Sequence, residues 1–331
     1  MPVEVPLHMP FVHDIRPGAG VTAATYLSAY LGGLANTAGD TPVFVLEGRQ
    51  PGGTIFVAGG THANEIAGVM AAIALIERAT VEQGRLIVIP HANNAAVDAR
   101  DPVHPGPQWV TLGTGSGARR FKYGSRLTRP DLQGAPDPPE FRHPHALDRL
   151  AGHEARNLDR AYPGRPNGTL TERIAWAIVR LLKTESVDVA FDLHEAGPGS
   201  RLAWMIVAHP RSIDLAALAV VNLDFAGIPM KLEHSSETFR GLSHREWGDA
   251  TKAHTFLVET PNPAQADGAA NADVVGDPTL PLEARVGVQL STLLAVLDAY
   301  NDNAPPRRQI RLTHVPELSH LHKSGLGAFL Q

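Results

Sequence analysis

The sequence predicts an α/β fold with parallel strand pairing. Apolar runs at residues 54–58 and 85–90 flank an alanine-rich segment at residues 65–79, and the order strand, helix, strand implies that the two strands are parallel. Two later apolar runs, at residues 187–195 and 255–260, end in polar side chains as the first run does. Because ligands of open α/β sheets bind outside the carboxyl ends of the strands, these side chains are expected to converge on one crevice.

The remaining elements are assigned from apolar periodicity, turn residues and helix caps. A capping box formed by Thr169 and Glu172 starts one of the helices. Helices are expected at residues 21–34, 65–79, 169–183, 212–225 and 282–298. Strands are expected at residues 42–46, 54–58, 85–90, 187–195, 202–208, 229–233, 255–260 and, in the tail, 309–313. The turn-rich residues 48–53 between the first two strands suggest a hairpin.

No internal repeat or clear domain boundary is visible, so residues 1–331 are interpreted as a single domain. Residues 91–153 lack a sustained apolar period and are expected to be a loop-rich insertion near the site. Gly113, Gly115 and Gly117 in this segment lack the strand-to-helix context of a phosphate loop and are interpreted as flexible linker. Residues 301–331 form a short C-terminal tail.

Composition limits the classes of function. A formal net charge of −5 and the absence of long basic runs argue against nucleic acid as a partner. No run of about eighteen apolar residues and no signal-peptide pattern is present, so we expect a cytoplasmic protein without a membrane partner. The chain has no cysteine, so histidine and carboxylate must hold any metal. A small molecule is the expected partner, and assembly into a homo-oligomer is left open.

Three residues at strand ends have the side chains of a zinc site. His62 and Glu65 follow the strand at residues 54–58, and His194 lies at the end of the strand at residues 187–195. Catalytic zinc sites commonly combine two histidines and one glutamate with an open position, so we expect one zinc ion per chain. Such an ion activates a water molecule and polarises the carbonyl that the water attacks.

Two further kinds of side chain complete this chemistry. Glu259, at the end of the strand at residues 255–260, is suited to take the proton of the attacking water and pass it to a leaving amine. Arg156 and Arg160 are the candidates for the positive charge that stabilises the oxyanion.

The order of these motifs resembles the succinylglutamate desuccinylase and aspartoacylase family of the zinc carboxypeptidase clan. The matching pieces are HxxE at residues 62–65, RNLDRAYPG at 156–164, DLHE at 192–195 and VE at 258–259, and the resemblance extends over about residues 54–300. It implies a mixed, mostly parallel eight-stranded sheet between helices. The residue roles that it implies are zinc ligation by His62, Glu65 and His194, general base and acid catalysis by Glu259, anchoring of a substrate carboxylate by Arg160, and oxyanion stabilisation by Arg156.

The sequence departs from the family pattern in two places. Where the family has Asp-Leu-Asn-Arg, this chain has Asn157, Leu158, Asp159 and Arg160, so an acid replaces an amide that could donate to a substrate carboxylate. Either Asp159 turns away and orients Arg160, or the substrate carries an amine or amide there, with Asn157 also near the substrate. Aspartoacylases have a further β-rich C-terminal domain over the site, whereas here residues 91–153 are the expected cover.

The family comparison also places a pocket loop before the strand that carries Glu259, which makes Arg240 and His244 candidate substrate contacts. The leading hypothesis is a zinc-dependent amidohydrolase that removes the acyl group from a small N-acyl amino acid or related N-acyl amine. A metallocarboxypeptidase acting on peptide C-termini is the alternative enzyme. A zinc-containing binding protein without turnover is the alternative from another class, although it would need neither an activated water nor Glu259.

Overall fold

The computed structural model describes residues 14–102, 107–146, 148–269 and 272–331, and the proline-punctuated lead lies mostly outside them. The helices are α1 (Ile66–Arg78), α2 (Leu170–Thr184), α3 (Ile213–Phe225), α4 (Ser243–Ala250), α5 (Leu282–Asn303) and α6 (Leu318–Ser324). The strands are β1 (Ala23–Tyr26), β2 (Pro42–Glu47), β3 (Gln50–Gly59), β4 (Thr80–Ile89), β5 (Trp109–Thr114), β6 (Gly117–Lys122), β7 (Glu140–Phe141), β8 (Leu150–Ala151), β9 (Val189–Ala196), β10 (Met205–Ala208), β11 (Lys231–His234), β12 (His254–Pro261) and β13 (Arg311–Thr313). As predicted, the Thr169 and Glu172 capping box starts α2.

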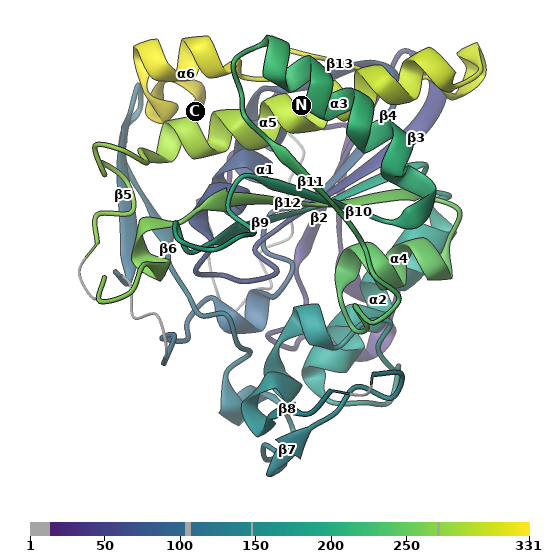
Figure 1. Cartoon of the computed structure of the whole chain (residues 1–331), viewed down its shortest axis with the longest axis vertical. Coiled ribbons are helices and arrows are strands. Elements are labelled where there is room, and N and C mark those ends of the chain that lie inside the picture. The colour runs from purple at the N-terminus through teal and green to yellow at the C-terminus, as the bar shows by residue number, and fades with distance from the viewer. Residues whose placement is uncertain (1–13, 103–106, 147, 270–271) are drawn as a thin grey trace.

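A mixed central sheet organises the molecule (Figure 1). Its order is β1-β2-β4-β3-β9-β12-β10-β11, and β13 pairs with β4. The central strands β4, β3, β9 and β12 are parallel to one another, whereas β2 and β13 run antiparallel to β4 and β10 runs antiparallel to β12. The mixed α/β class is confirmed, but the described sheet has nine strands rather than eight, because β1 forms an edge strand where a helix is expected.

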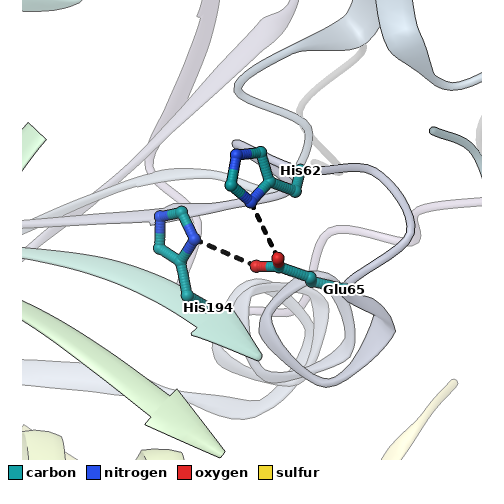
Figure 2. A group of neighbouring side chains, drawn as sticks. All are labelled: His62, Glu65 and His194. Atoms are coloured by element: carbon teal, nitrogen blue, oxygen red, sulfur yellow. Dashed lines mark hydrogen bonds and ion pairs between the residues drawn. The ribbon is translucent and has the colours of Figure 1, made fainter. Parts of the chain in front are cut away.

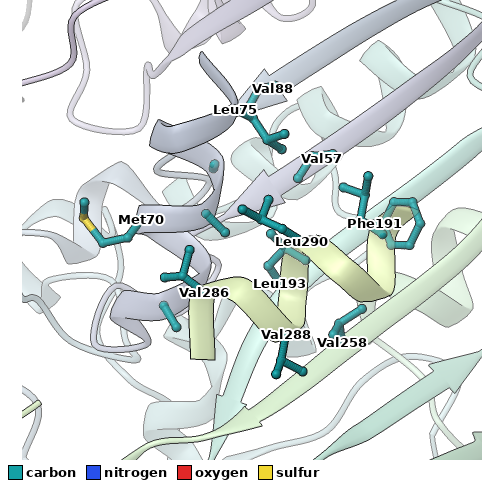
Figure 3. Packing of buried hydrophobic residues seen from close by; sticks show 14 of the residues in the cluster. Val57, Met70, Leu75, Val88, Phe191, Leu193, Val258, Val286, Val288 and Leu290 are labelled. Carbon is teal, nitrogen blue, oxygen red and sulfur yellow. The ribbon is translucent and has the colours of Figure 1, made fainter. Parts of the chain in front are cut away.

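Helices cover both faces of the sheet, and the side chains of the strands alternate between them. In β3, Ile55 and Val57 belong to the core under α1, α3 and α5, whereas Phe56 and Ala58 belong to the core under α2 and α4. Figure 3 shows the first core, in which Leu290 of α5 packs near strand side chains. Burial on both faces explains why the central strands are continuous apolar runs in the sequence.

Two predictions about the N-terminal part of the sheet are wrong. Residues 21–34 contain β1 and two 3₁₀ turns instead of a helix, because Ala23 to Tyr26 pair antiparallel with β2. β2 and β3 do not form a hairpin, since β4 lies between them. α1 connects β3 to β4, and this crossover places β4 beside β3 in parallel.

The insertion at residues 91–153 is more ordered than its composition suggests. Its described part contains the hairpin β5–β6 and the short pair β7–β8. Gly113, Gly115 and Gly117 belong to the β5–β6 hairpin, and Gly117 has a φ of 112°, so the flexible-linker interpretation is wrong. In the tail, the strand predicted at residues 309–313 is confirmed as β13.

The start of α1 lies directly against the sheet because glycine occupies the contact. A Cβ atom at Gly68 would lie 2.4 Å from the carbonyl oxygen of Leu193 in β9, and one at Gly59 in β3 would lie 2.4 Å from the carbonyl oxygen of Gly68. Both distances are shorter than van der Waals contact, so these positions require glycine. The close approach fixes the first turn of α1 beside the residue that precedes His194.

We expect Gly68→Ala to destabilise the protein by about 1–3 kcal/mol, because the added methyl group overpacks the contact with β9. Thermal denaturation checks this value. Gly113→Ala is the matched control, since a Cβ atom there meets no atom of the described residues within 4 Å. Equal melting temperatures for the two variants would show that α1 can shift without cost.

Candidate active site

The loop between β3 and α1 and the strand β9 bring three ligand-type side chains together (Figure 2). Glu65 lies between the two imidazoles, with Oε1 2.7 Å from Nδ1 of His62 and Oε2 2.9 Å from Nδ1 of His194. One ligand atom from each residue lies within 4.8 Å of the others. The structure thus gathers the three residues that the sequence suggests as metal ligands.

The opposite nitrogen of each imidazole has its own partner. Nε2 of His62 lies 2.9 Å from Oδ1 of Asn157, and Nε2 of His194 lies 2.9 Å from Oδ2 of Asp192. Oδ1 of Asp192 accepts a hydrogen bond from the hydroxyl of Thr61 at 2.7 Å. Metal-ligating histidines commonly have a polar partner at the second nitrogen. The partner of His62 is an amide oxygen at hydrogen-bond distance, whereas Nε2 of His194 lies close to Asp192 without hydrogen-bond geometry. The side chains therefore fit a divalent cation bound by the two Nδ1 atoms and the Glu65 carboxylate.

Glu259 lies next to this group on the neighbouring strand. Glu259 of β12 is the register partner of His194 in the parallel strand β9. The carboxyl group is buried, and its Oε2 has no hydrogen-bond partner among the described residues. Burial and the nearby carboxylate of Glu65 raise the pKa of Glu259 well above its usual value. Such a carboxyl group is suited to proton transfer near neutral pH.

These residues border a cavity of about 440 Å³. Of the predicted site residues, those in its wall are His62, Glu65, Asp159, Arg160, His194, Arg240, His244 and Glu259. The described part of the insertion at residues 91–153 contributes five residues to the wall, which are Arg126, His143, Ala146, Asp148 and Leu150. Arg156 and Asn157 are not part of the wall.

Arg156 is engaged elsewhere. Its Nε donates to Oδ1 of Asp137 at 2.8 Å, and its Nη1 donates to the carbonyl oxygen of Thr128 at 2.6 Å. The predicted oxyanion role of Arg156 therefore does not agree with its position. Arg126, which the sequence reasoning missed, lies in the wall, and its buried Nε has no hydrogen-bond partner among the described residues.

Arg126 also acts electrostatically on the site. Its charge opposes the rise that burial and Glu65 cause in the pKa of Glu259. Its nearest acidic partner, Glu154, is 3.9 Å away, so the guanidinium is only weakly paired. The segment around Arg126 carries no recognisable motif, and the sequence offered no signal that would have identified this residue.

Asp159 and Arg160 lie together at the wall. Oδ1 of Asp159 accepts a hydrogen bond from the backbone N–H of Ser243 at 2.7 Å, while its Oδ2 is 3.7 Å from Nη1 of Arg160. Nη1 of Arg160 donates to the carbonyl oxygen of Asp159 at 2.6 Å. Burial raises the pKa of Asp159 above its usual value. These contacts favour the interpretation in which Asp159 turns toward α4 and orients Arg160.

Arg240 and His244 differ in what they can offer a ligand. Arg240 is paired with Glu246 at 3.0 Å and with Asp249 at 2.8 Å, so its charge is compensated within the protein. His244 is buried, and neither ring nitrogen has a hydrogen-bond partner in the described part of the chain. Burial and the nearby His194 lower the pKa of His244 to about 3, so this imidazole is neutral.

Comparison with known proteins finds a partial sequence match and a shared fold. No family model matches the chain. Over 158 residues, or 47% of this chain and 32% of the relative, it is 30% identical to N-alpha-acetyl-L-2,4-diaminobutyric acid deacetylase of Halomonas elongata. The chain thus matches about a third of the length of this curated relative.

Two solved structures align with most of this chain. The succinylglutamate desuccinylase/aspartoacylase from Rhodobacter sphaeroides is 18% identical, with a TM-score of 0.48 over 78% of this chain and 58% of that chain. The cell shape determinant protein Csd4 of Helicobacter pylori is 12% identical, with a TM-score of 0.52 over 85% and 58% of the two chains, which shows a shared fold. The chain resembles the proteins of the succinylglutamate desuccinylase/aspartoacylase family, as its motifs predict.

Proposed function

We propose that the protein is a zinc-dependent amidohydrolase that removes the acyl group from a small N-acyl amino acid or a related N-acyl amine. The observation that carries this proposal is the register of β9 and β12. It sets the buried carboxyl group of Glu259, one oxygen of which has no hydrogen-bond partner among the described residues, beside His194 in the histidine and glutamate cluster. A site that only binds a ligand has no need of a proton-transfer group in this place.

The protein side chains divide the chemistry among them. His62, Glu65 and His194 would hold the zinc ion, which supplies Lewis acidity and lowers the pKa of a water molecule when bound. The carboxylate of Glu259 takes the proton of the attacking water and then gives it to the leaving amine. The weakly paired guanidinium of Arg126 donates hydrogen bonds to the developing oxyanion.

The position of Arg160 in the cavity wall supports an anionic substrate. Arg160 reaches the wall with its acidic neighbours Asp159 and Glu154 at 3.7 and 3.9 Å, which leaves donors for a substrate carboxylate. The named substrate of the Halomonas elongata relative is an N-acetylated amino acid, in agreement with this class. His244 contributes a neutral polar group to the same wall.

The alternative enzyme is a metallocarboxypeptidase that removes a C-terminal residue. It is favoured by the shared fold with Csd4, of which one solved structure contains a bound tripeptide. A cytoplasmic location remains our expectation. Within the described residues, no helix has the length and apolar character that a membrane span requires.

Amine release by the zinc-loaded protein tests the proposed function. The panel contains N-acyl amino acids, N-acyl amines without a carboxylate, and short peptides. Release from one acyl class supports the deacylase and identifies its substrate type, whereas release only from peptide C-termini supports the carboxypeptidase. Zinc binding without release from any member of the panel would contradict both enzymes and favour a binding role.

We expect Arg160→Met to raise KM for N-acyl amino acids by about 10-fold to 100-fold, because a charged hydrogen bond to the substrate carboxylate contributes about 1.5–3 kcal/mol. The kcat value should change little, since this contact is also present in the ground state. Arg165→Met is the matched control, because the side chain of Arg165 is 70% exposed and pairs with Glu172. A similar rise in KM for an N-acyl amine without a carboxylate would contradict the anchoring role.

A further inference from the structure

A chain of hydrogen bonds connects His62 to a carboxylate outside the cluster. Oδ1 of Asn157 lies 2.9 Å from Nε2 of His62, and Nδ2 of Asn157 donates to Oε2 of Glu154 at 2.7 Å. Glu154 and Asn157 are three residues apart at the end of a 3₁₀ helix, Gly152–Arg156, and this spacing places side chains on one side of the helix. The aspartate that the family pattern has at position 157 is thus replaced by an amide with a carboxylate behind it.

The direction of each hydrogen bond in this chain is determined. An ionised carboxylate only accepts, so Glu154 must face the NH₂ group of Asn157. The backbone N–H of Asp159 donates to Oδ1 of Asn157 at 3.0 Å, which independently fixes the same amide orientation. Oδ1 only accepts, so His62 must donate to it from Nε2. The lone pair of His62 is then on Nδ1, the atom that faces Glu65.

Glu154 also lies between the two arginines of the cavity wall. Its Oε2 is 3.9 Å from Nη2 of Arg126 and 3.9 Å from Nε of Arg160, and Oε1 is 3.8 Å from the ring of the exposed His153. Only 16% of the Glu154 side chain is exposed. One carboxylate therefore contacts the amide behind the metal cluster and lies 3.9 Å from both guanidinium groups.

We propose that Glu154 is a positioning residue that acts through Asn157 to hold His62 in its metal-binding tautomer and keeps Arg126 and Arg160 directed at the cavity. This inference deepens the proposed function and rests on it, because it takes the cluster to be a zinc site. Glu154 itself contacts neither the cluster nor the cavity. Its effect on zinc passes through the Asn157 amide, and its effect on substrate passes through the arginines.

The test moves the carboxylate instead of only removing it. Glu154→Gln removes the charge, and the double variant Glu154→Gln with Asn157→Asp returns a carboxylate in direct contact with His62. Zinc affinity is measured on each full-length protein by competition with a chromophoric chelator, and folding of the metal-free protein is followed by circular dichroism. Glu140→Gln is the matched control, because Glu140 lies in the same segment and forms an exposed pair with Arg149.

We expect Glu154→Gln to weaken zinc binding by about 10-fold to 100-fold, the usual effect of losing an outer partner of a metal ligand. The double variant should recover at least tenfold of this loss but keep a raised KM, since its new carboxylate no longer lies between the arginines. Zinc affinity of Glu154→Gln within twofold of the Glu140→Gln control, or no recovery in the double variant, would overturn the proposal. Failure of both Glu154 variants to fold would assign Glu154 a purely structural role and would also overturn it. If the wild-type protein binds no zinc, the proposed function itself fails.

Discussion

Glu259→Gln is expected to lower kcat by about 10²-fold to 10⁴-fold, the range that a positioned general base and acid contributes. The register partner of Glu259 is His194, so the carboxyl group lies directly beside the cluster. The amide of glutamine preserves the shape of the side chain but cannot take a proton from water. Zinc content should be unchanged, because the two histidines and Glu65 remain in place.

Although Glu259→Gln lowers kcat, it is expected to preserve or raise the stability of the folded protein at neutral pH. Folding raises the pKa of Glu259 above the ordinary value of 4.5, so the folded protein favours the neutral acid. The stability of the metal-free protein should therefore fall as pH rises from about this value through the folded pKa, since the folded state then binds more protons than the unfolded state. The glutamine variant lacks this loss and should melt at or above the wild-type temperature at neutral pH.

Measurements of kcat and of metal-free melting curves from acidic to neutral pH check both parts. Glu47→Gln provides the control, because Glu47 is exposed at the end of β2, away from the cavity. Retained turnover in Glu259→Gln would remove Glu259 from the chemistry. A melting temperature well below that of the wild type would instead show that the carboxylate has a structural partner in the folded protein.

The apolar runs in the sequence were sufficient to predict the site residues that lie at strand ends. His62, Glu65, His194 and Glu259 each follow or end an apolar run, and parallel pairing of β3, β9 and β12 brings those ends to one edge. The apolar runs themselves are strong signals because both faces of these strands are buried. Both the fold class and the grouping of these side chains could therefore be predicted.

Features that depend on contacts between distant segments could not be predicted in this way. Residues 23–26 are a strand only because β2 lies alongside them, and a helical composition gives no sign of that pairing. Arg126 reaches the cavity because Leu127 forms a bridge with Asn157 and the backbone N–H of Arg126 donates to Asp101. Arg156 belongs to the matching motif, yet its guanidinium is bonded to Thr128 and Asp137.

Alanine variants of Arg126 and Arg156 are expected to have opposite effects on kcat and on stability. Comparing them tests which of the two arginines stabilises the oxyanion. We expect Arg126→Ala to lower kcat by about 10²-fold to 10³-fold, the effect of removing one oxyanion donor. Its stability should change little, because the side chain is 34% exposed and its ion pair with Glu154, the one found for the guanidinium among the described residues, is 3.9 Å long. We expect the reverse from Arg156→Ala, which loses two charge-assisted hydrogen bonds and should be destabilised by about 1.5–3 kcal/mol per bond with little change in kcat.

Steady-state kinetics and denaturant unfolding of both variants, under conditions in which each is folded, separate the two roles. The comparison is internal, because both variants remove the same side chain and both residues lie within the described insertion and the segment that follows it. A large loss of kcat in Arg156→Ala with normal turnover in Arg126→Ala would return the oxyanion role to the motif residue. It would then require the contacts of Arg156 with Asp137 and Thr128 to break when substrate binds.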